Sequence, residues 1–580
     1  MNICTIYGPS RSLDAIFVAG VRGYSNIQRF LGALIWQVLL IRREFIEYEK
    51  FNLCRPIMSV KNPVAIVILL LVIIVAASIF SIDRSTQGQN KGQEGTRFQH
   101  PFPTLEDPHL KIELVADGLS VPTGMLFLDK YNILVLQRYT SGFPLGGLTI
   151  VKLVTNGSMK SEPVLTVPSG LCDKENINCD VFNERGLLGI TARKINPDNA
   201  TLVGNLEVFL YYTEVTLNGE VLGNRVYKYL WDGNKLINPT LILDLPALPG
   251  QGNVGGKILV GPDDYLYVVI GDVTTSNSTI PIHEDVAQIK QVLCCPIGHR
   301  GHLQNILSVP SVDNTSVILR VNPENGLPAP DNPFIDITGV DNEINDNNSI
   351  DNNTNYDVSS LSRYYAYGIR NSFGMAFDPI TGNLWDTENG EDHYDEINFV
   401  EPGFNSGWSK IVGPINRINA TETDIRAYGL DTWNELKLKP TFDVTESELV
   451  NFPGANYSDP EFSWKNAIGV TALGFLNSSK LGEKYRNNLF VGDYSYGNLY
   501  FFKLNNNRDG IEFNKNQTGV SDLVADDAKE REGVVLGTGF DIITDIQTGP
   551  DGYLYILSYS EYSNDRPDNI SRIYRILPNN

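Results

Sequence analysis

Short segments that alternate apolar and polar residues recur along the chain, each after a turn containing Pro, Asp or Gly. The clearest copies are GPDDYLYVVIGD at 261–272, FDPITGNLWDTENG at 377–390 and GPDGYLYILSYS at 549–560, and looser copies lie at 124–138, 189–214 and 472–504. Alternation bounded by such turns predicts pairs of short antiparallel strands. Six copies allow roughly 75 residues for each unit, enough for a four-stranded sheet. The pattern therefore predicts an all-β fold, a six-bladed β-propeller, because a two-sheet sandwich would not repeat so regularly.

A second pattern marks the N-terminus, where residues 64–82 run VAIVILLLVIIVAASIFSI without a charge. At about 1.5 Å per residue, a helix of this length covers about 28 Å, close to the hydrocarbon thickness of a bilayer. We expect one transmembrane helix over 63–82, with a cleaved signal peptide as the alternative. Residues 1–62 carry 8 Lys+Arg and 4 Asp+Glu, a net charge of 8 − 4 = +4. Because positive flanks stay in the cytoplasm, the rest of the chain is expected outside.

These patterns divide the chain into four segments. We expect a cytoplasmic segment over 1–62, where Met58 offers an alternative start, an anchor over 63–82, a flexible tether over 83–104 and the propeller over 105–580. The expected location is the cell membrane, crossed once, with the large domain extracytoplasmic. Two cysteine pairs bear on this location: Cys172 and Cys179 bracket a short polar loop, as a disulfide would, whereas Cys294 and Cys295 fit either a vicinal disulfide or two thiols.

Composition narrows the class of protein and its partners. The chain has 51 Gly, 31 Pro and 27 Tyr against 5 Met, which favours turns and aromatic strands over long helices. With 42% hydrophobic and 20% charged residues it is ordinary for a globular protein, so disordered, collagenous and multi-span membrane classes are excluded. The net charge of −22 argues against nucleic acid as a partner and favours a divalent cation.

Carboxylates gather in one strand–loop–strand unit at 365–409. The loop after Trp385 combines several glycines with five acidic residues, Glu388, Glu391, Asp392, Asp395 and Glu396. Carboxylate and carbonyl oxygens are the ligands that calcium prefers, so this loop is a candidate calcium site, with a solvated acidic loop as the alternative. The Asp/Asn-rich tract at 341–357 lacks the Gly of a calcium-binding loop and is expected to be a solvated loop.

The same unit resembles the signature of the glucose/sorbosone dehydrogenase family. The motifs YGIRNSFGMAFDP, LWDTENG, DEINFV and PGFNSGWS follow the family's order and spacing, and two further landmarks lie at 253–272 (NVGGKILVGPDDYLYVVIGD) and 318–334 (ILRVNPENGLPAPDNPF). The resemblance covers about residues 108–577. Family members are quinoproteins that oxidise sugars with pyrroloquinoline quinone (PQQ) and calcium on a six-bladed propeller. The resemblance therefore implies that fold, those cofactors and a sugar substrate.

The resemblance also implies roles for individual positions. Arg370 and Asn371 occupy the family's Arg-Asn pair beside the quinone, Asn389 stands at a Gln position, and Asp395 stands at the position of an acidic residue in the same pocket. Calcium is implied at three main-chain carbonyls, those of Gly390, Glu391 and Ser406.

Several positions depart from the family pattern. Asn253 stands where the family has its general-base His, and an amide cannot accept a proton near neutral pH. The family's Lys and Arg-x-Arg cations against the quinone are replaced by the neutral residues Ser495, Ile542 and Thr544, which should weaken PQQ binding. His393, inside the acidic loop, is the best candidate to replace the missing base.

We therefore expect a membrane-anchored, extracytoplasmic aldose dehydrogenase that uses PQQ and calcium, has a divergent active site and passes electrons to an unidentified acceptor. The alternative is a non-catalytic, calcium-stabilised surface propeller that binds a glycan or a protein. A calcium-dependent hydrolase such as a lactonase would need carboxylates converging on an exposed metal, and nothing in the sequence singles such residues out.

Overall fold

The computed structural model describes residues 102–579, apart from 139–147, 170–183, 217–218, 249, 274–313, 336–359, 391–392, 409–410, 419–445, 447–448, 450, 514–518, 521 and 561–569. All described residues belong to the second of two units, Phe98–Asn580. None of the helices in this described part is long and apolar enough to cross a bilayer. The predicted anchor, the cysteine pairs and the tract at 341–357 lie outside the described residues.

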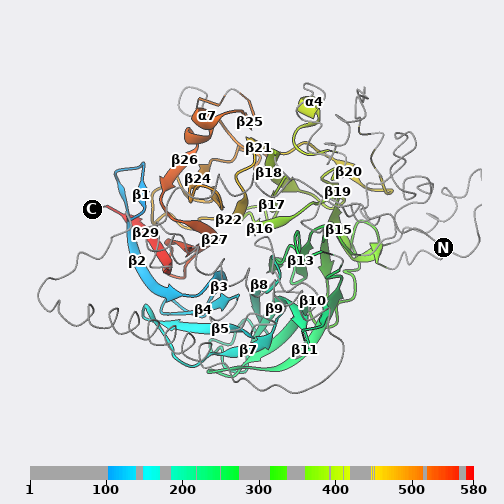
Figure 1. Ribbon diagram of the computed structural model, residues 1–580, viewed down its shortest axis with the longest axis vertical. Coiled ribbons are helices and arrows are strands. Elements are labelled where there is room, and N and C mark those ends of the chain that lie inside the picture. Colours follow the sequence, from blue (N-terminus) through cyan, green and yellow to red (C-terminus); the bar gives the residue numbers. More distant parts are fainter. Residues whose placement is uncertain are drawn as a thin grey trace, which may run out of the picture. The chain divides into compact units, whose positions relative to one another are not determined.

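Within the described residues, the strands form six sheets (Figure 1). Sheet 1 contains β3 (Pro122–Phe127), β4 (Asn132–Gln137), β5 (Leu148–Thr155), β6 (Ser158–Met159) and β7 (Leu165–Pro168). Sheet 2 contains β8 (Leu187–Lys194), β9 (Leu206–Val215), β10 (Val221–Trp231) and β11 (Leu236–Leu245). Sheet 3 contains β12 (Ile258–Val260), β13 (Leu266–Ile270), β14 (Val317–Val321), β15 (Tyr364–Tyr367), β19 (Phe404–Asn405) and β20 (Asn456–Tyr457).

The other three sheets complete the set. Sheet 4 contains β16 (Ser372–Phe377), β17 (Leu384–Glu388), β18 (His393–Val400), β21 (Phe462–Asn466) and β25 (Val524–Ala525). Sheet 5 contains β22 (Val470–Phe475), β23 (Leu489–Asp493), β24 (Leu499–Phe502), β26 (Val535–Thr538) and β1 (Thr104–Leu105). Sheet 6 contains β27 (Ile542–Thr548), β28 (Leu554–Tyr559), β29 (Ser571–Pro578) and β2 (Leu110–Leu119). The helices of the described part are short: η1 (Leu361–Arg363), α4 (Ile415–Ile418) and α7 (Ala528–Glu532).

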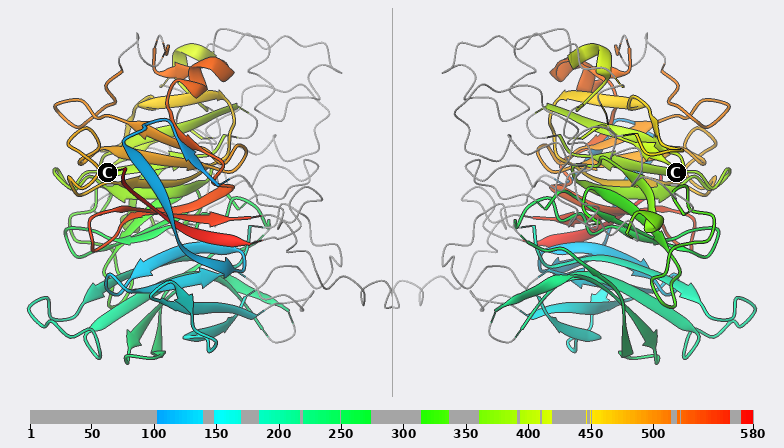
Figure 2. Two further views of the ribbon diagram at one scale, coloured as in Figure 1. Left: turned by 90° about the vertical axis from the view of Figure 1, so that its left-hand side faces the viewer. Right: turned by 90° about the vertical axis from the view of Figure 1, so that its right-hand side faces the viewer.

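The sheets form a closed ring. The first strand of each sheet contacts the first strands of its two neighbours, in the order β3, β8, β12, β16, β22, β27 and back to β3. The last sheet joins the two ends of the ring, because β2 pairs antiparallel with β29, as the blue and red strands of Figure 2 show. The all-β propeller predicted from the repeats is confirmed, and the apolar faces of adjacent sheets pack into its core.

The inner strands approach closely enough that some positions accept only glycine. A Cβ on Gly189 of β8 would collide with the carbonyl oxygen of Gly256, which precedes β12. A Cβ on Gly374 of β16 would lie 2.8 Å from the backbone nitrogen of Leu473 in β22. Glycine at these positions therefore lets neighbouring sheets meet at the hub.

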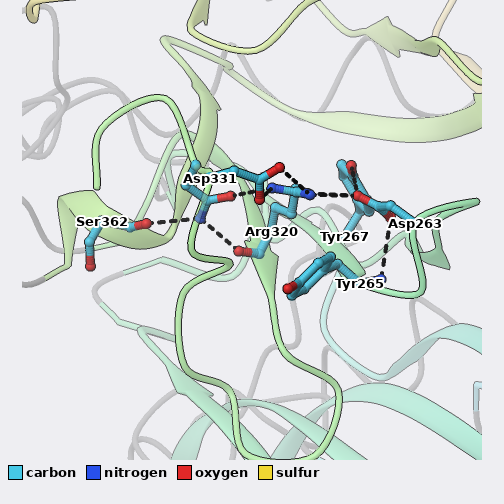
Figure 3. Close-up of polar contacts among 7 residues, drawn as sticks. Asp263, Tyr265, Tyr267, Arg320, Asp331 and Ser362 are labelled. Atoms are coloured by element: carbon cyan, nitrogen blue, oxygen red, sulfur yellow. Dashed lines mark hydrogen bonds and ion pairs between the residues drawn. The ribbon is translucent and has the colours of Figure 1, made fainter. Parts of the chain in front are cut away.

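In two of the sheets, the aspartate of the repeated GPD turn forms hydrogen bonds that hold the turn to neighbouring strands. In sheet 3 the Oδ2 of Asp263 accepts from the hydroxyl of Tyr267 at 2.9 Å and from the guanidinium of Arg320 at 2.8 Å (Figure 3). Arg320 also donates to Asp331 Oδ1 at 2.7 Å and lies over the Tyr265 ring, 4.5 Å from its centroid. These bonds tie the β12–β13 turn, strand β14 and the segment after it together.

The second GPD turn repeats this arrangement in sheet 6. The Oδ2 of Asp551 accepts from the Tyr555 hydroxyl at 2.9 Å and from Arg575 at 2.7 Å, and Arg575 lies 5.6 Å from the centroid of the Tyr553 ring. The two sequence copies, GPDDYLY and GPDGYLY, thus encode the same local fastening. The recurrent Asp and Tyr therefore stabilise each sheet through these hydrogen bonds.

We predict that Arg320→Met lowers the thermal midpoint of the protein by several degrees. The substitution leaves Asp263 and Asp331 without their shared cation, and the guanidinium it removes is only 8% exposed. Losing one partner of such a pair costs about 2 to 4 kcal/mol. Differential scanning fluorimetry measures the shift. Arg486→Met is the control, because its pair with Glu483 is exposed and contributes about 0.5 kcal/mol or less. Equal midpoints for the two variants would contradict the prediction.

Candidate active site

Arg370 lies between β15 and β16, where sheet 3 meets sheet 4. Its backbone N–H donates to Glu388 Oε1 at 2.6 Å, and its Nη1 donates to the carbonyl oxygens of Asn389 and Gly390, both at 3.0 Å. Its guanidinium carbon lies 5.4 Å from the centroid of the Trp408 ring. Hydrogen bonds to its backbone and side chain, together with the Trp408 ring, fix the orientation of the Arg370 guanidinium. A planar cation held in this way can bind an anionic or electron-rich group.

Asn371 connects this turn to the neighbouring sheet. Its Oδ1 accepts from the backbone N–H of Gly255 at 3.1 Å, and its Nδ2 donates to Glu184 Oε2 at 3.2 Å. Its own carbonyl accepts from the N–H of Asn389 at 2.8 Å. The side chain is buried, so these bonds fix the predicted Arg370–Asn371 pair in place.

Asn253 is held by an aspartate that also contacts the Arg370 turn. Asn253 adopts a left-handed backbone with φ of 54°, and its Nδ2 donates to Asp272 Oδ1 at 2.8 Å. Asp272 accepts at Oδ2 from Trp408 Nε1 at 2.9 Å, and its N–H donates to the carbonyl of Arg370 at 3.0 Å. The amide at 253 is thus a hydrogen-bond donor to Asp272, and the structure places it in the same cluster as Arg370.

Asp395 fixes the turn after β17 to sheet 5. Its Oδ1 accepts from the N–H of Gly390 at 3.0 Å, and its Oδ2 accepts from the N–H groups of Ile468 and Gly469, both at 2.6 Å. Burial raises the pKa of Asp395 to about 6, although these three N–H groups and Arg370 act to lower it. Asp395 is therefore primarily a positioning residue for Gly390.

Three further carboxyl groups share one buried face of sheet 4. The register of β17 and β18 places Glu388 opposite Glu396 and Asp386 opposite Asn398. Burial raises the pKa of Glu388 and of Glu396, and their mutual repulsion raises the pKa of Glu388 further. Burial also raises the pKa of Asp386 to about 7, and neither of its oxygens has a hydrogen-bond partner of good geometry among the described residues. Burial therefore disfavours the ionised form of all three acids.

The residues predicted to hold calcium are close together where the structure describes them. Ser406 donates its hydroxyl to Glu388 Oε2 at 2.6 Å, and Gly390 presents its carbonyl to Arg370. A Cβ on Gly390 would collide with the carbonyl oxygens of His393 and Tyr394, so the tight turn requires glycine. Glu391 lies outside the described residues. No three His, Cys, Asp or Glu side chains in the described part are arranged to hold a metal, so a calcium ion here would need main-chain oxygens.

Within the described residues, two side chains next to the Gly390 turn carry a polar atom that has no hydrogen-bond partner. His393 begins β18 and pairs with Asn466 of β21, and its Nδ1 has no hydrogen-bond partner among the described residues. The Oδ1 of Asn389 is likewise unpartnered within the described part, and this residue is only 8% exposed. A buried, unpartnered amide oxygen next to the Gly390 turn is the kind of group that a bound cation or ligand donor would satisfy.

Three positions where the family has cations are neutral in this chain, and Lys257 forms an ion pair next to one of them. Ser495 is exposed after β23, while Ile542 and Thr544 lie on β27. Lys257 Nζ lies 2.8 Å from Oδ1 of Asp545, the residue after Thr544. Because sheets 3 and 6 lie opposite each other in the ring, this ion pair spans the hub.

Sequence reasoning missed four residues of this cluster: Glu184, Lys257, Asp272 and Trp408. Asp272 closes the landmark at 253–272 and Trp408 lies in the motif PGFNSGWS, so both were visible as parts of motifs although no role followed from them. Lys257 also lies in the landmark at 253–272, but its role and that of Glu184, which lies in no motif, depend on which sheets face each other in the ring.

Comparison with known proteins identifies related sequences. A family model described as Glucose / Sorbosone dehydrogenase matches residues 343–565. An aldose sugar dehydrogenase of Escherichia coli (strain K12) is 24% identical over 454 residues, covering 77% of this chain and 90% of that protein. Quinoprotein glucose dehydrogenase B of Acinetobacter calcoaceticus is 27% identical over 320 residues, covering 54% of this chain and 55% of that protein.

The fold is also found among solved structures. A putative oxidoreductase (glucose dehydrogenase) from Thermus thermophilus superposes with a TM-score of 0.50 at 22% identity. The match covers 81% of this chain and 100% of the other. At this level of identity the likeness supports the propeller fold alone.

We predict that Asp386→Asn stabilises the protein at pH 8 and leaves its stability at pH 4 nearly unchanged. In the folded protein the pKa of Asp386 is about 7, above its ordinary value of 3.8. Because the buried carboxyl group resists ionisation, the folded state loses stability as the pH rises from 3.8 to about 7. The full penalty is present at pH 8, and removing it is worth roughly 2 to 4 kcal/mol. Thermal midpoints at the two pH values test this, with the exposed Asp264→Asn as control. A midpoint at pH 8 that falls, or that rises equally at pH 4, would contradict it.

Proposed function

We propose that this chain is a distant member of the glucose/sorbosone dehydrogenase family, and that it is a PQQ- and calcium-dependent oxidoreductase that oxidises a hydroxyl group of an aldose sugar. The observation that supports this best is the cluster around Arg370. It joins a fixed guanidinium, an aromatic face and hydrogen-bonding amides at the junction of two sheets. Ligand sites are typically built from a few such convergent polar groups beside aromatic side chains.

Calcium fits the turn after β17. The Gly390 and Ser406 carbonyls, with that of Glu391, would hold it, and the unpartnered Oδ1 of Asn389 is an oxygen donor beside them within the described part. Glu388 and Asp395 add negative charge directly behind the turn, and their raised pKa values would fall once a divalent cation lies next to them.

PQQ fits with fewer cations than the resemblance implies. Arg370 can pair with a carboxylate or carbonyl oxygen of the quinone, and Trp408 offers a flat face beside it. Lys257 is a second cation near the hub, but Asp545 already neutralises it. Since Ser495, Ile542 and Thr544 are neutral, we infer a divergent site that binds PQQ weakly.

When bound, PQQ would supply a two-electron acceptor for the hydrogen on the oxidised carbon. Within the chain, Arg370 and Asn371 orient the reacting groups, and Trp408 excludes water from one side. Asn253 cannot take the hydroxyl proton, because a side-chain amide is not basic near neutral pH; its Nδ2 donates to Asp272 instead. His393 remains a candidate acceptor through its Nδ1, which is unpartnered among the described residues.

The setting of this activity is part of the proposal. We infer that each of the six sheets is one blade, that residues 63–82 anchor the chain in the cell membrane, and that the propeller faces the extracytoplasmic side. The apolar run at 64–82 and the positive charge of residues 1–62 support this orientation.

We predict that the purified protein with PQQ and calcium reduces an artificial electron acceptor when given aldoses. Arg370→Ala should lower kcat/KM about 100-fold, because the oriented cation is lost. Arg225→Ala is the control, since Arg225 pairs with Glu214 and Asp244 in the outer strands of sheet 2 and should leave activity unchanged. No absorbance change on titrating PQQ into the protein, together with no turnover, would reject the proposal.

The alternative function is a non-catalytic, calcium-stabilised propeller that binds a glycan or a protein. This alternative is favoured by the absence of the family's cations and general base in a chain that keeps the propeller fold. The positions concerned are 253, 495, 542 and 544. A glycan array read with and without calcium separates the two functions. Calcium-dependent glycan binding without PQQ binding would support the alternative, whereas PQQ-dependent turnover would exclude it.

A further inference from the structure

Asn253 leaves the proposed reaction without an acceptor for the hydroxyl proton at the position where one is expected. Removing hydride from a carbon that bears a hydroxyl group requires that the hydroxyl lose its proton to a nearby base. The inference below rests on the proposed function, and it concerns which residue of this chain takes that proton.

Two carboxylates lie next to Asn253, and they differ in their hydrogen bonds. Asp272 is fully buried and binds Asn253 Nδ2 with one oxygen and Trp408 Nε1 with the other, so it serves to position those groups. Glu184 is only partly buried. Its Oε2 accepts from Asn371 Nδ2 at 3.2 Å and from the N–H of Val254 at 3.3 Å.

The backbone places Glu184 at the junction of sheets 2 and 3. It precedes β8, and its N–H donates to the carbonyl of Gln251 at 2.9 Å. Its carboxylate therefore lies beside Val254, the residue that follows Asn253. The same carboxylate also contacts Asn371. Glu184 thus directly contacts both the segment containing the replaced base and the Arg370–Asn371 pair.

The other acids of the site are less suited to accept this proton. Asp395 is fully buried and receives three backbone N–H groups. Glu388 and Glu396 face each other inside sheet 4 and are bonded to Ser406 and to the N–H of Gly413, respectively. Asp395 therefore holds the Gly390 turn, while Glu388 and Glu396 are committed to Ser406 and Gly413.

We propose that Glu184, which lies beside the 253–254 segment, is the general base of this chain in place of His393, and that it takes the role of the histidine that is absent at position 253. In the step, the O–H bond of the sugar hydroxyl breaks and its proton goes to a Glu184 oxygen. The C–H bond on the same carbon breaks, and PQQ, when bound, would supply the two-electron acceptor for the hydride that leaves. A carbonyl double bond forms on the sugar carbon, which gives a lactone when the anomeric hydroxyl of a cyclic aldose is oxidised.

The electrostatic surroundings of Glu184 agree with that role. Burial raises its pKa, while Arg370, the N–H groups of Val254 and Asn253, and Arg138 act to lower it. A carboxylate with a raised pKa is a stronger proton acceptor than an exposed glutamate, once the pH is high enough to ionise it. Activity should therefore rise with pH through an acid limb that lies above the ordinary glutamate pKa of 4.5.

The test compares Glu184→Gln with Glu461→Gln in the full chain with PQQ and calcium. Glu461 is a matched control, because it is also partly buried and burial raises its pKa to about 7, but it lies by β21 away from Arg370. We expect Glu184→Gln to lower kcat about 100-fold or more, with KM changed less than about threefold, and to lose the acid limb. Glu461→Gln should keep both. Asn253→His added to Glu184→Gln should restore part of the activity.

A second measurement does not depend on turnover. Carbon-13 NMR of protein labelled at the glutamate carboxyl carbons, compared between wild type and Glu184→Gln, assigns the titration of Glu184. A pKa at or below the ordinary value of 4.5 would overturn the inference. Unchanged kcat and pH profile in Glu184→Gln, with an active wild type, would overturn it while leaving the proposed function in place. A wild type that binds PQQ but oxidises no aldose would reject the proposed function and this inference together.

Discussion

The close approach of inner strands at the hub is the constraint on which the rest of the structure depends. Six sheets meet there through their first strands, and at Gly189 and Gly374 the backbone of the neighbouring sheet occupies the space of a Cβ. This contact lets the backbones of neighbouring sheets approach closely. It also brings the turn at 370–371, between two sheets, into contact with the turn at 388–390 and with the segment at 251–255. The candidate site is a product of ring geometry rather than of any one blade.

Buried charge is the second theme of the structure. Arg320 and Arg575 each neutralise the aspartate of a GPD turn, so these charges stabilise their sheets. The carboxyl groups of sheet 4 are different, because Asp386, Glu388 and Glu396 are buried together and no cation neutralises them within the described residues. Burying such groups without a cation lowers the free energy of unfolding, so their presence calls for a role other than stability. They lie on β17 and β18, the two strands that the Gly390 turn connects, which is consistent with a functional site.

Much of the fold could be predicted from the sequence, and less of the site. The GPDDYLY and GPDGYLY repeats predict hairpins, because turn residues and alternation act locally, and the structure confirms them. The sequence singles out five candidate site residues because they occupy one continuous motif, and their roles stay predictions: Arg370, Asn371, Asn389, Gly390 and Asp395. Glu184 and Lys257 were not found, since the sheets that make them neighbours of Asn371 and Asp545 are far apart in sequence. Residues whose roles arise from ring closure give no local signal.

The pairing of β2 with β29 has a consequence for biosynthesis. Leu119 lies opposite Ser571, so 571 − 119 = 452 residues must be made after the first partner before the second exists. At about 5 to 20 residues per second, the ribosome needs roughly 20 to 90 s for that stretch. Throughout this time the early strand has an open edge that attracts foreign strands. A nascent chain of this design is therefore exposed to non-native strand pairing until its last strand emerges, and premature termination leaves an open sheet edge instead of a closed ring.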